Sequence, residues 1–305
     1  MSNKAFIFPG QGSQFVGMAK DLYENFKEVK EVYNKANEIL RFDLVKISFE
    51  GPEDILKQTR ITQPAIFVHS ASLIQLLRKK TISPDMAAGH SLGEYSALYA
   101  AGVLTFEDGL KLVKTRAELM QKAGELNPGT MAAVVGLETE TVKRVCNEAS
   151  VFGMVQVANF NSPVQIVISG SINGVKKAME LAKEHGAKKV IPLVVSGAFH
   201  SPLMQNAREG LEKVLNEIEL KEASFPVYTN VDANPVTKPE AVKYYLREQL
   251  TKPVRWVEII ENMISHGTTE FYEIGPGNVL TGLLKRINRE VVGIAVSNLE
   301  NLEKI

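Results

Sequence analysis

The chain has 305 residues, of which 45% are hydrophobic and 23% are charged, a composition typical of a globular protein with a large core. Its 35 basic and 35 acidic residues give a formal net charge of zero, so composition provides no indication of a nucleic-acid partner. A single cysteine, Cys146, excludes an intramolecular disulfide, and no stretch approaches the roughly 20 apolar residues that cross a membrane.

In chain order, short apolar runs alternate with longer segments of helical periodicity. The first run, Ala5–Phe8, is too short for a signal peptide and ends at Pro9-Gly10, so we expect a cytoplasmic protein. The expected strands are 5–8, 86–89, 190–195, 226–229, 269–274 and 291–296. The expected helices are 26–40, 64–80, 92–101, 106–124, 211–218, 240–250, 254–266 and 277–288. This alternation predicts an α/β fold with a mostly parallel sheet.

Residues 131–193 follow a different order. They read as strand 131–136, helix 138–149, strand 155–159, strand 165–169, helix 172–185 and strand 188–193, which is the βαββαβ order of a ferredoxin-like unit. We therefore predict a large α/β domain of 1–126 and 197–305, interrupted by a small ferredoxin-like subdomain of 127–196. A ligand would bind in the cleft between the two.

Residues 89–93 read Gly89-His90-Ser91-Leu92-Gly93, which is the Gly-x-Ser-x-Gly pattern of a nucleophile elbow. The pattern follows a predicted strand and precedes a predicted helix, which is the context that this turn requires. The turn would expose the Ser91 hydroxyl above a helix N-terminus, where backbone N–H groups can receive developing negative charge. The alternative is an ordinary strand-to-helix turn, because the bare pattern is common by chance.

An elbow serine needs a base, and the chain has five histidines. His200 follows the predicted strand 190–195 on a loop, so it would lie at the same sheet edge as Ser91. His90 neighbours the serine on a tight turn and is expected to pack behind the elbow. The alternative for His200 is a loop histidine that bonds only to the backbone. No aspartate stands out as its orienting partner, but a backbone carbonyl would serve.

These motifs together resemble malonyl-CoA:acyl carrier protein transacylases along essentially the whole chain. The matching elements, in the family's order, are Phe8-Pro9-Gly10-Gln11-Gly12-Ser13-Gln14, Gln63-Pro64-Ala65, Gly89-His90-Ser91-Leu92-Gly93-Glu94, Arg116, Asn159-Phe160-Asn161 and Gly197-Ala198-Phe199-His200-Ser201. The resemblance implies a hydrolase-like α/β core with a ferredoxin-like insertion. It also implies transfer of a malonyl group from malonyl-CoA to the pantetheine thiol of acyl carrier protein, for fatty-acid biosynthesis, with no cofactor or metal.

The resemblance also implies residue roles. Ser91 would carry the acyl group as an ester, and His200 would act as general base and then general acid. The backbone carbonyl of Gln249 would orient His200, and the backbone N–H groups of Gln11 and Leu92 would form the oxyanion hole. An exposed polar side chain near a helix end is the competing interpretation of Gln249.

By the same resemblance, Arg116 would bind the free carboxylate of the malonyl group, through a guanidinium fork that matches a carboxylate. From the sequence alone, an exposed helix arginine is the alternative. Phe199 would disfavour a branched methylmalonyl group, or would simply pack in the core. Gln63, Asn159 and Asn161 are further candidate substrate contacts, although Asn161-Ser162-Pro163 is also an ordinary turn sequence.

Several features leave alternatives open. Lys188 and Lys189 could dock an acidic carrier protein or could be solvated charges. Cys146 is expected in the core, and Glu94 is expected to cap or pair near the elbow helix. The rival functions are a thioester hydrolase on the same scaffold, a non-catalytic carrier-binding subunit, and a transferase of a polyketide pathway.

Overall fold

A computed structural model describes residues 3–305. The larger of its two sheets has six strands in the order β10-β9-β1-β2-β7-β8. The strands are β1 (Asn3–Phe8), β2 (Met86–Gly89), β7 (Val227–Tyr228), β8 (Pro235–Val236), β9 (Thr268–Ile274) and β10 (Val292–Val296). All neighbouring pairs are parallel except β7 with β8. The predicted α/β fold with a mostly parallel sheet is therefore confirmed.

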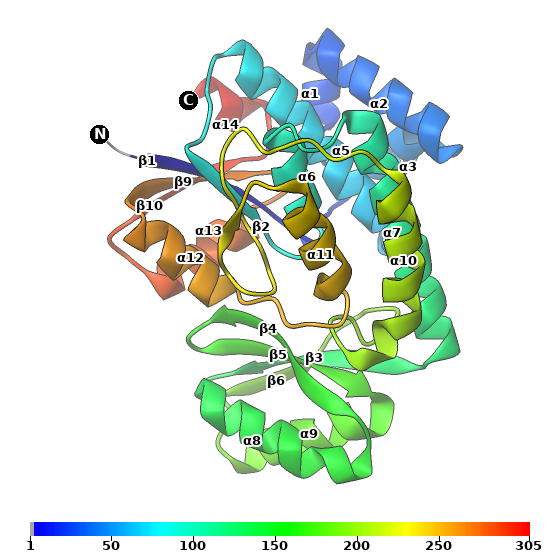
Figure 1. The fold of residues 1–305 in the computed structure, drawn as a ribbon, viewed down its shortest axis with the longest axis vertical. Coiled ribbons are helices and arrows are strands. Elements are labelled where there is room, and N and C mark those ends of the chain that lie inside the picture. The colour runs from blue at the N-terminus through cyan, green and yellow to red at the C-terminus, as the bar shows by residue number, and fades with distance from the viewer. Residues whose placement is uncertain (1–2) are drawn as a thin grey trace.

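Helices cover both faces of this sheet (Figure 1). They are α1 (Lys20–Asn25), α2 (Lys27–Leu40), α3 (Leu44–Glu50), α4 (Glu53–Leu56), α5 (Thr59–Lys79), α6 (Gly93–Ala100), α7 (Phe106–Leu126), α10 (Gln205–Glu217), α11 (Pro239–Gln249), α12 (Trp256–Ser265), α13 (Val279–Ile287) and α14 (Leu299–Glu303). Side chains alternate along β1, so Phe6 and Phe8 join the core formed with α5 and α7. Ala5 and Ile7 join the opposite core formed with α12 and α13. Because both faces of the sheet are buried at β1, the strand is a continuous run of apolar residues.

The second sheet is antiparallel and has the order β4-β5-β3-β6. Its elements are β3 (Gly129–Val135), α8 (Thr139–Ala149), β4 (Val155–Ser162), β5 (Gln165–Ser171), α9 (Ile172–Glu184) and β6 (Lys189–Pro192). The observed order is βαββαβ, as predicted. Helices α8 and α9 pack on one face over a core of their own, and the other face of the sheet is turned toward the larger sheet and its helices (Figure 1). The exact boundaries of the small subdomain, 127–196, stay a prediction.

The expected strand 190–195 is wrong in its extent and in its sheet. The observed strand ends at Pro192 and pairs with β3 in the small sheet. It is an edge strand, and a proline is tolerated there because its missing N–H breaks no inter-strand ladder. Val194, beyond its end, is 92% exposed, so the apolar run that suggested a longer strand is not buried.

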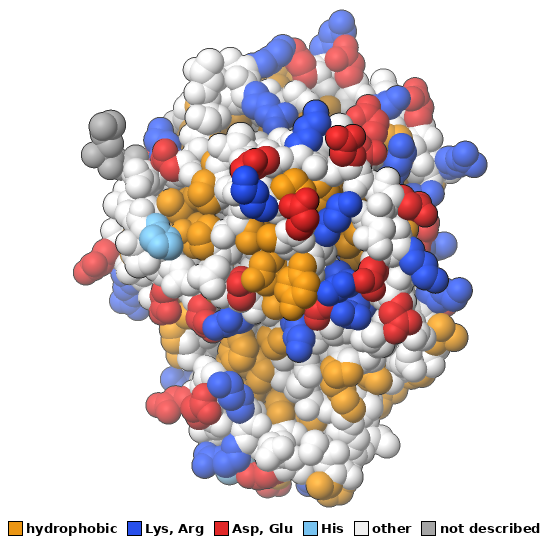
Figure 2. Space-filling model, viewed as in Figure 1, with side chains coloured by type: hydrophobic (Ala, Val, Ile, Leu, Met, Phe, Trp, Pro, Cys, Tyr) orange, Lys and Arg blue, Asp and Glu red, His pale blue; other side chains and the backbone are white. Residues whose placement is uncertain are grey.

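The surface is hollowed where β4 and α8 of the small subdomain meet the rest of the chain. A recess of about 580 Å³ lies between the small sheet and the segments 202–205 and 251–253. In Figure 2 apolar side chains gather along this boundary, whereas charges of both signs lie over the helices above it. No helix within residues 3–305 is both long enough and apolar enough to span a bilayer.

Candidate active site

Ser91 lies on a turn whose backbone only particular residues allow. It follows β2 and precedes α6, and its φ of 52° places it in the left-handed region. A Cβ on Gly89 would lie 1.8 Å from the carbonyl carbon of Gly93, and a Cβ on Gly93 would lie 2.0 Å from the Phe8 oxygen. Both glycines are therefore required by close packing of the backbone, as a nucleophile elbow demands.

The backbone of Ser91 is held by side chains from distant segments. Its N–H donates to Asn230 Oδ1 at 2.7 Å, and its carbonyl accepts from Gln249 Nε2 at 2.9 Å. Asn230 Nδ2 in turn donates to the Gly89 carbonyl at 2.7 Å. A left-handed serine costs on the order of 1–3 kcal/mol, and these bonds hold it in place.

His200 and Ser91 lie within proton-transfer distance. The distance between Ser91 Oγ and His200 Nε2 is 2.8 Å, and His200 Nδ1 lies 2.8 Å from the Gln249 backbone oxygen. A carbonyl can only accept, so Nδ1 carries the proton and Nε2 is free to accept one from the serine. The structure thus brings together the three residues that the sequence analysis assigned to the nucleophile, the base and its orienting carbonyl.

The orienting carbonyl also has a favourable electrostatic position. Gln249 is the last residue of α11 and is fully buried, which excludes the exposed interpretation. Carbonyls in the last turn of a helix lack intrahelical donors and carry the negative end of the helix dipole. The Gln249 oxygen can therefore stabilise a positive imidazole ring, the task that an aspartate performs in other serine enzymes.

His200 is buried and uncharged. Burial, and then the nearby charge of Arg116, lower the pKa of His200 to about 3, although the bond to Gln249 acts in the opposite direction. The imidazole is therefore a neutral base throughout the physiological pH range.

Arg116 is fully buried beneath the nucleophile, so the alternative of an exposed helix arginine is wrong. Its Nη1 donates to Gln63 Oε1 at 2.6 Å, and its Nη2 donates to Gln249 Oε1 at 2.8 Å. These acceptors are neutral amides, and Arg116 Nε has no partner among the described residues. A buried guanidinium whose protein acceptors are neutral has the chemistry to bind an anionic group.

A cavity of about 150 Å³ joins these groups. Its lining comprises Gln11, Gln63, His90, Ser91, Leu92, Arg116, Met120, Met131, Asn159, Asn161, Val167, Leu193, Val195, Phe199 and His200. The small sheet contributes to the lining, since Met131 and Val167 come from β3 and β5. All predicted site residues therefore line one cavity except Gln249, which lies behind it and contacts Arg116 and His200.

Two backbone N–H groups in this cavity are available for a substrate oxygen. Gln11 lies on the turn after β1, and Leu92 immediately precedes α6. Within residues 3–305 neither N–H donates a hydrogen bond to another protein group. The N-terminus of α6 adds a positive partial charge at Leu92, so the two groups are suited to a developing oxyanion.

Comparison with known proteins agrees with this site. The family model described as acyl transferase domain matches residues 5–301. A malonyl CoA-acyl carrier protein transacylase from Bacillus subtilis is 48% identical over 304 residues, covering 99% of this chain and 96% of that protein. This chain belongs to the malonyl CoA-acyl carrier protein transacylase family.

Solved structures of similar proteins superpose on this chain over nearly its whole length. An acyl carrier protein S-malonyltransferase from Vibrio cholerae superposes with a TM-score of 0.96 at 43% identity, covering 99% of each chain. A malonyl-transacylase in complex with a type II polyketide acyl-carrier protein superposes with a TM-score of 0.97 at 41% identity, covering 99% of this chain and 98% of that one.

The position of His90 differs from the one expected from the sequence. It was expected to pack behind the elbow, but its ring lines the cavity. Its Nε2 lies 2.8 Å from Asn161 Oδ1, and its ring centre lies 5.5 Å from that of Trp256. These partners come from β4 and α12, so they fix a ring position that local turn geometry could not reveal.

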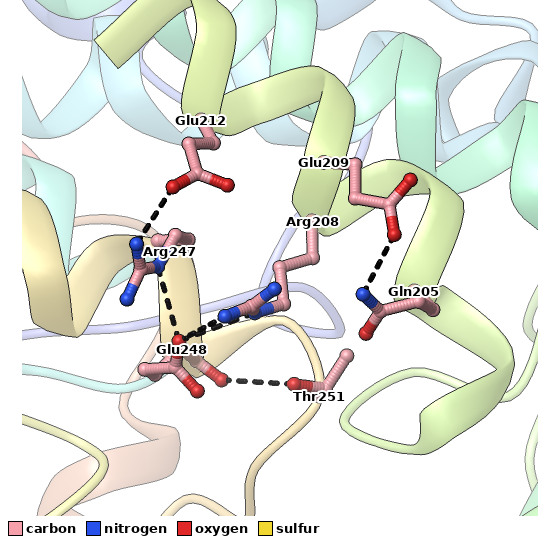
Figure 3. A network of polar contacts seen from close by, with 7 residues as sticks. All are labelled: Gln205, Arg208, Glu209, Glu212, Arg247, Glu248 and Thr251. Carbon is pink, nitrogen blue, oxygen red and sulfur yellow. Dashed lines mark hydrogen bonds and ion pairs between the residues drawn. The ribbon is translucent and has the colours of Figure 1, made fainter. Parts of the chain in front are cut away.

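The end of α11 is fixed by a charged network that sequence reasoning missed (Figure 3). Glu248 accepts from Arg208 Nε of α10 at 3.2 Å and from Arg247 Nε at 3.0 Å, and Arg247 Nη1 reaches Glu212 at 2.7 Å. Partial burial acts to raise the pKa of Glu248, but the two arginines outweigh it and the pKa is lowered. The network ties α10 to α11 immediately before Gln249.

Asn230 was also missed. It follows β7, so it lies at the carboxyl edge of the parallel sheet where Ser91 lies, and it is fully buried. Its place after a predicted strand could have identified it, because polar residues at that edge commonly form the site.

Cys146 is buried in the core of the small sheet as expected, and burial raises the pKa of its thiol to about 12. Its thiol is therefore not a nucleophile.

The two lysines whose role the sequence left undecided lie at the edge of the small sheet. Lys188 and Lys189 are exposed, at the start of β6.

No group of three or more histidine, cysteine, aspartate and glutamate side chains capable of holding a metal occurs within the described part of the chain.

Proposed function

We propose that this chain transfers a malonyl group from malonyl-CoA to the pantetheine thiol of acyl carrier protein, through a malonyl ester of Ser91, and so supplies fatty-acid biosynthesis. The observation that carries the proposal is the contact of Ser91 Oγ with both His200 Nε2, at 2.8 Å, and Arg116 Nη2, at 3.0 Å. A nucleophile beside a buried cation favours an acyl group that carries its own carboxylate.

In the first half-reaction, the malonyl carboxylate pairs with Arg116 and the thioester carbonyl lies against Ser91. His200 Nε2 accepts the proton of the serine hydroxyl as Oγ attacks the carbonyl carbon. The resulting oxyanion is stabilised by the N–H groups of Gln11 and Leu92. When the carbon–sulfur bond breaks, His200 returns its proton to the sulfur and CoA leaves as the free thiol.

The second half-reaction reverses these steps. The pantetheine thiol of the carrier protein gives its proton to His200, and its sulfur attacks the ester carbonyl. The carbon–oxygen bond breaks and Ser91 recovers the proton, so the thioester is formed on the carrier. This sequence predicts ping-pong kinetics and needs no metal or resident cofactor.

Substrate contacts outside the reacting atoms complete the proposal. Gln63 holds Arg116, and Asn159 and Asn161 face the cavity from β4. Phe199 is buried against the cavity, where a branched methyl group would have to fit.

The decisive experiment exposes the protein to a mixture of malonyl-, acetyl- and methylmalonyl-CoA and then maps the modified peptide by mass spectrometry. Malonyl should be found on Ser91, and Ser91→Ala should carry none. A subsequent chase with the carrier protein should move the label to the pantetheine. Release of the label to water at the same rate without a carrier would favour the thioester hydrolase instead, and an unmodified Ser91 would favour the carrier-binding subunit.

A further inference from the structure

A buried carboxylate lies beside the elbow, outside the lining of the substrate cavity. Glu94 is the second residue of α6 and is only 2% exposed. It is absent from the cavity lining and makes no direct ion pair with Arg116 among the described residues. Burying a carboxylate costs several kcal/mol unless its oxygens are well bonded, so its partners indicate why it is there.

Those partners are the two side chains that hold Ser91. One oxygen, Oε2, accepts from Gln249 Nε2 at 2.8 Å and from the Asn230 backbone N–H at 3.1 Å. Gln249 Nε2 also donates to the Ser91 carbonyl, and Asn230 Oδ1 accepts from the Ser91 N–H. A single acceptor therefore anchors the groups on both sides of the nucleophile.

The same anchor extends to the base and to the carboxylate site. The Gln249 backbone oxygen accepts from His200 Nδ1, and its side-chain oxygen accepts from Arg116 Nη2. If the Gln249 side chain rotated, Arg116 Nη2 would lose its acceptor, whereas the backbone oxygen would remain on His200. Among residues 3–305, the other bond of its amide nitrogen within 3.0 Å goes to Ser91 itself, so Glu94 helps to fix the Gln249 side chain from outside the catalytic groups.

We propose that Glu94 is a positioning residue for the acyl transfer: by accepting from Gln249 and Asn230 it holds the strained Ser91 peptide and the side-chain acceptor of Arg116 in place. The role requires an oxygen acceptor at Oε2. It does not require a negative charge, because a neutral oxygen can accept the same two bonds. Burial is the main cause that raises the pKa of Glu94 to about 7, which agrees with a carboxyl group whose charge is not essential.

The proposal rests on the proposed function of Ser91, and it predicts different activities for two variants of Glu94. Glu94→Gln keeps an oxygen in place and should retain kcat within about threefold. Glu94→Met fills the same volume without an acceptor and should lower kcat about 100-fold, the scale expected when reacting groups are misplaced by an ångström or so. The KM for malonyl-CoA should change much less than kcat in both.

Two measurements separate positioning from a loss of stability. The rate at which Ser91 reacts with a small fluorophosphonate probe should fall in Glu94→Met and recover in Glu94→Gln. Glu273→Met is the matched control, because Glu273 is another fully buried carboxylate whose oxygens accept from the backbone N–H groups of Leu280 and Thr281, at 2.9 and 2.7 Å. It should lower the thermal midpoint without changing the probe rate.

Three results would overturn the inference. They are a Glu94→Met protein with wild-type kcat, a Glu94→Gln protein as impaired as Glu94→Met, and a change confined to KM. If Glu94→Met does not fold, Glu94→Leu, which also fills the space without an acceptor, is used in the same assays with the same expectations. Failure of the proposed function is distinguishable, since wild-type Ser91 would then remain unmodified by malonyl-CoA or would release the malonyl group to water without a carrier.

Discussion

The guanidinium of Arg116 donates a hydrogen bond of 3.0 Å to the hydroxyl oxygen of Ser91. The cation is thus placed against the nucleophile before any substrate arrives, while its remaining bonds go to neutral amides. In the proposed reaction, a malonyl carboxylate pairs directly with this cation within the same cavity as the serine. Under the proposed function, substrate selection and nucleophile placement would therefore depend on one side chain.

Removing this cation should reverse the acyl preference. Arg116→Ala is expected to lower kcat/KM for malonyl-CoA by about 10²–10⁴, equivalent to about 3–5 kcal/mol, because the substrate carboxylate is then buried without a partner. Acetyl transfer should change far less. Arg116→Lys, which keeps the charge but not the fork, should fall between the two. Equal losses for malonyl- and acetyl-CoA would contradict the role of Arg116 as a carboxylate site.

The low pKa of His200 predicts an unusual pH profile. An ordinary histidine titrates at about 6.5, but burial first and Arg116 second lower the pKa of His200 to about 3. The base stays neutral above that value, so kcat/KM for malonyl-CoA should be nearly constant from pH 8 to pH 5. A half-maximal rate centred near pH 6.5 in initial-rate measurements would show that the site does not shift this group.

The same shift predicts a dependence of stability on pH. Below about pH 6.5 the unfolded chain binds a proton at His200 that the folded protein does not bind until pH falls to about 3. The free energy of unfolding should therefore decrease as pH falls through this window. His200→Gln, which has no titrating group, should lose less stability than the wild type between pH 7 and pH 5, measured by urea denaturation.

The two functions of Gln249 should be separable. Gln249→Ala removes the side chain that contacts Arg116 and Glu94 but keeps the backbone oxygen on His200. We expect kcat to fall roughly 10- to 100-fold, the loss of one or two bonds of about 1.5 kcal/mol each. His200→Ala should cost about 10³ or more because it removes the base. Equal rates for the two variants would argue against a separate contribution from the backbone carbonyl.

The ion network of Figure 3 should contribute to stability. Glu248→Gln weakens the bonds to Arg208 and Arg247 and should lower the free energy of unfolding by about 1–3 kcal/mol, because this carboxylate is only 12% exposed. The pKa of Glu248 is lowered in the folded protein. Its contribution to the free energy of unfolding should therefore be present above the ordinary pKa of 4.5 and should be lost as the pH falls below that value.

An exposed pair provides the control for Glu248. Glu222 and Lys238 are 57% and 68% exposed, so Glu222→Gln should change the free energy of unfolding much less than Glu248→Gln does. Chemical denaturation of both variants would test the comparison. Equal effects would mean that the α10–α11 network does not stabilise the fold more than an ordinary surface pair.

Phe199 should limit the size of the acyl group. Its ring is 6% exposed and lines the cavity, so Phe199→Val should create room for a methyl branch. The ratio of methylmalonyl to malonyl kcat/KM should increase by roughly 10- to 100-fold, because a methyl group in a pocket contributes about 1–3 kcal/mol. An unchanged ratio in competition assays would assign Phe199 to core packing alone.

The sequence alone determined the α/β alternation and the βαββαβ insertion, because hydrophobic periodicity and turn residues act locally. It also determined the elbow, since Gly89 and Gly93 are demanded by contacts within a few residues and with the adjacent strand. It could not determine that Arg116 and Gln249 are buried, although each is in phase with the apolar stripe of its helix.

Only the tertiary structure decided which distant groups meet at Ser91. Asn230, Gln249 and His200 reach it from separations of 139, 158 and 109 residues, and no local pattern encodes such contacts. The pKa of His200 is likewise a property of the assembled site, because burial and the charge of Arg116 exist only when the two sheets and their helices are packed. The chemistry of each residue is local, but its position and protonation depend on the whole fold.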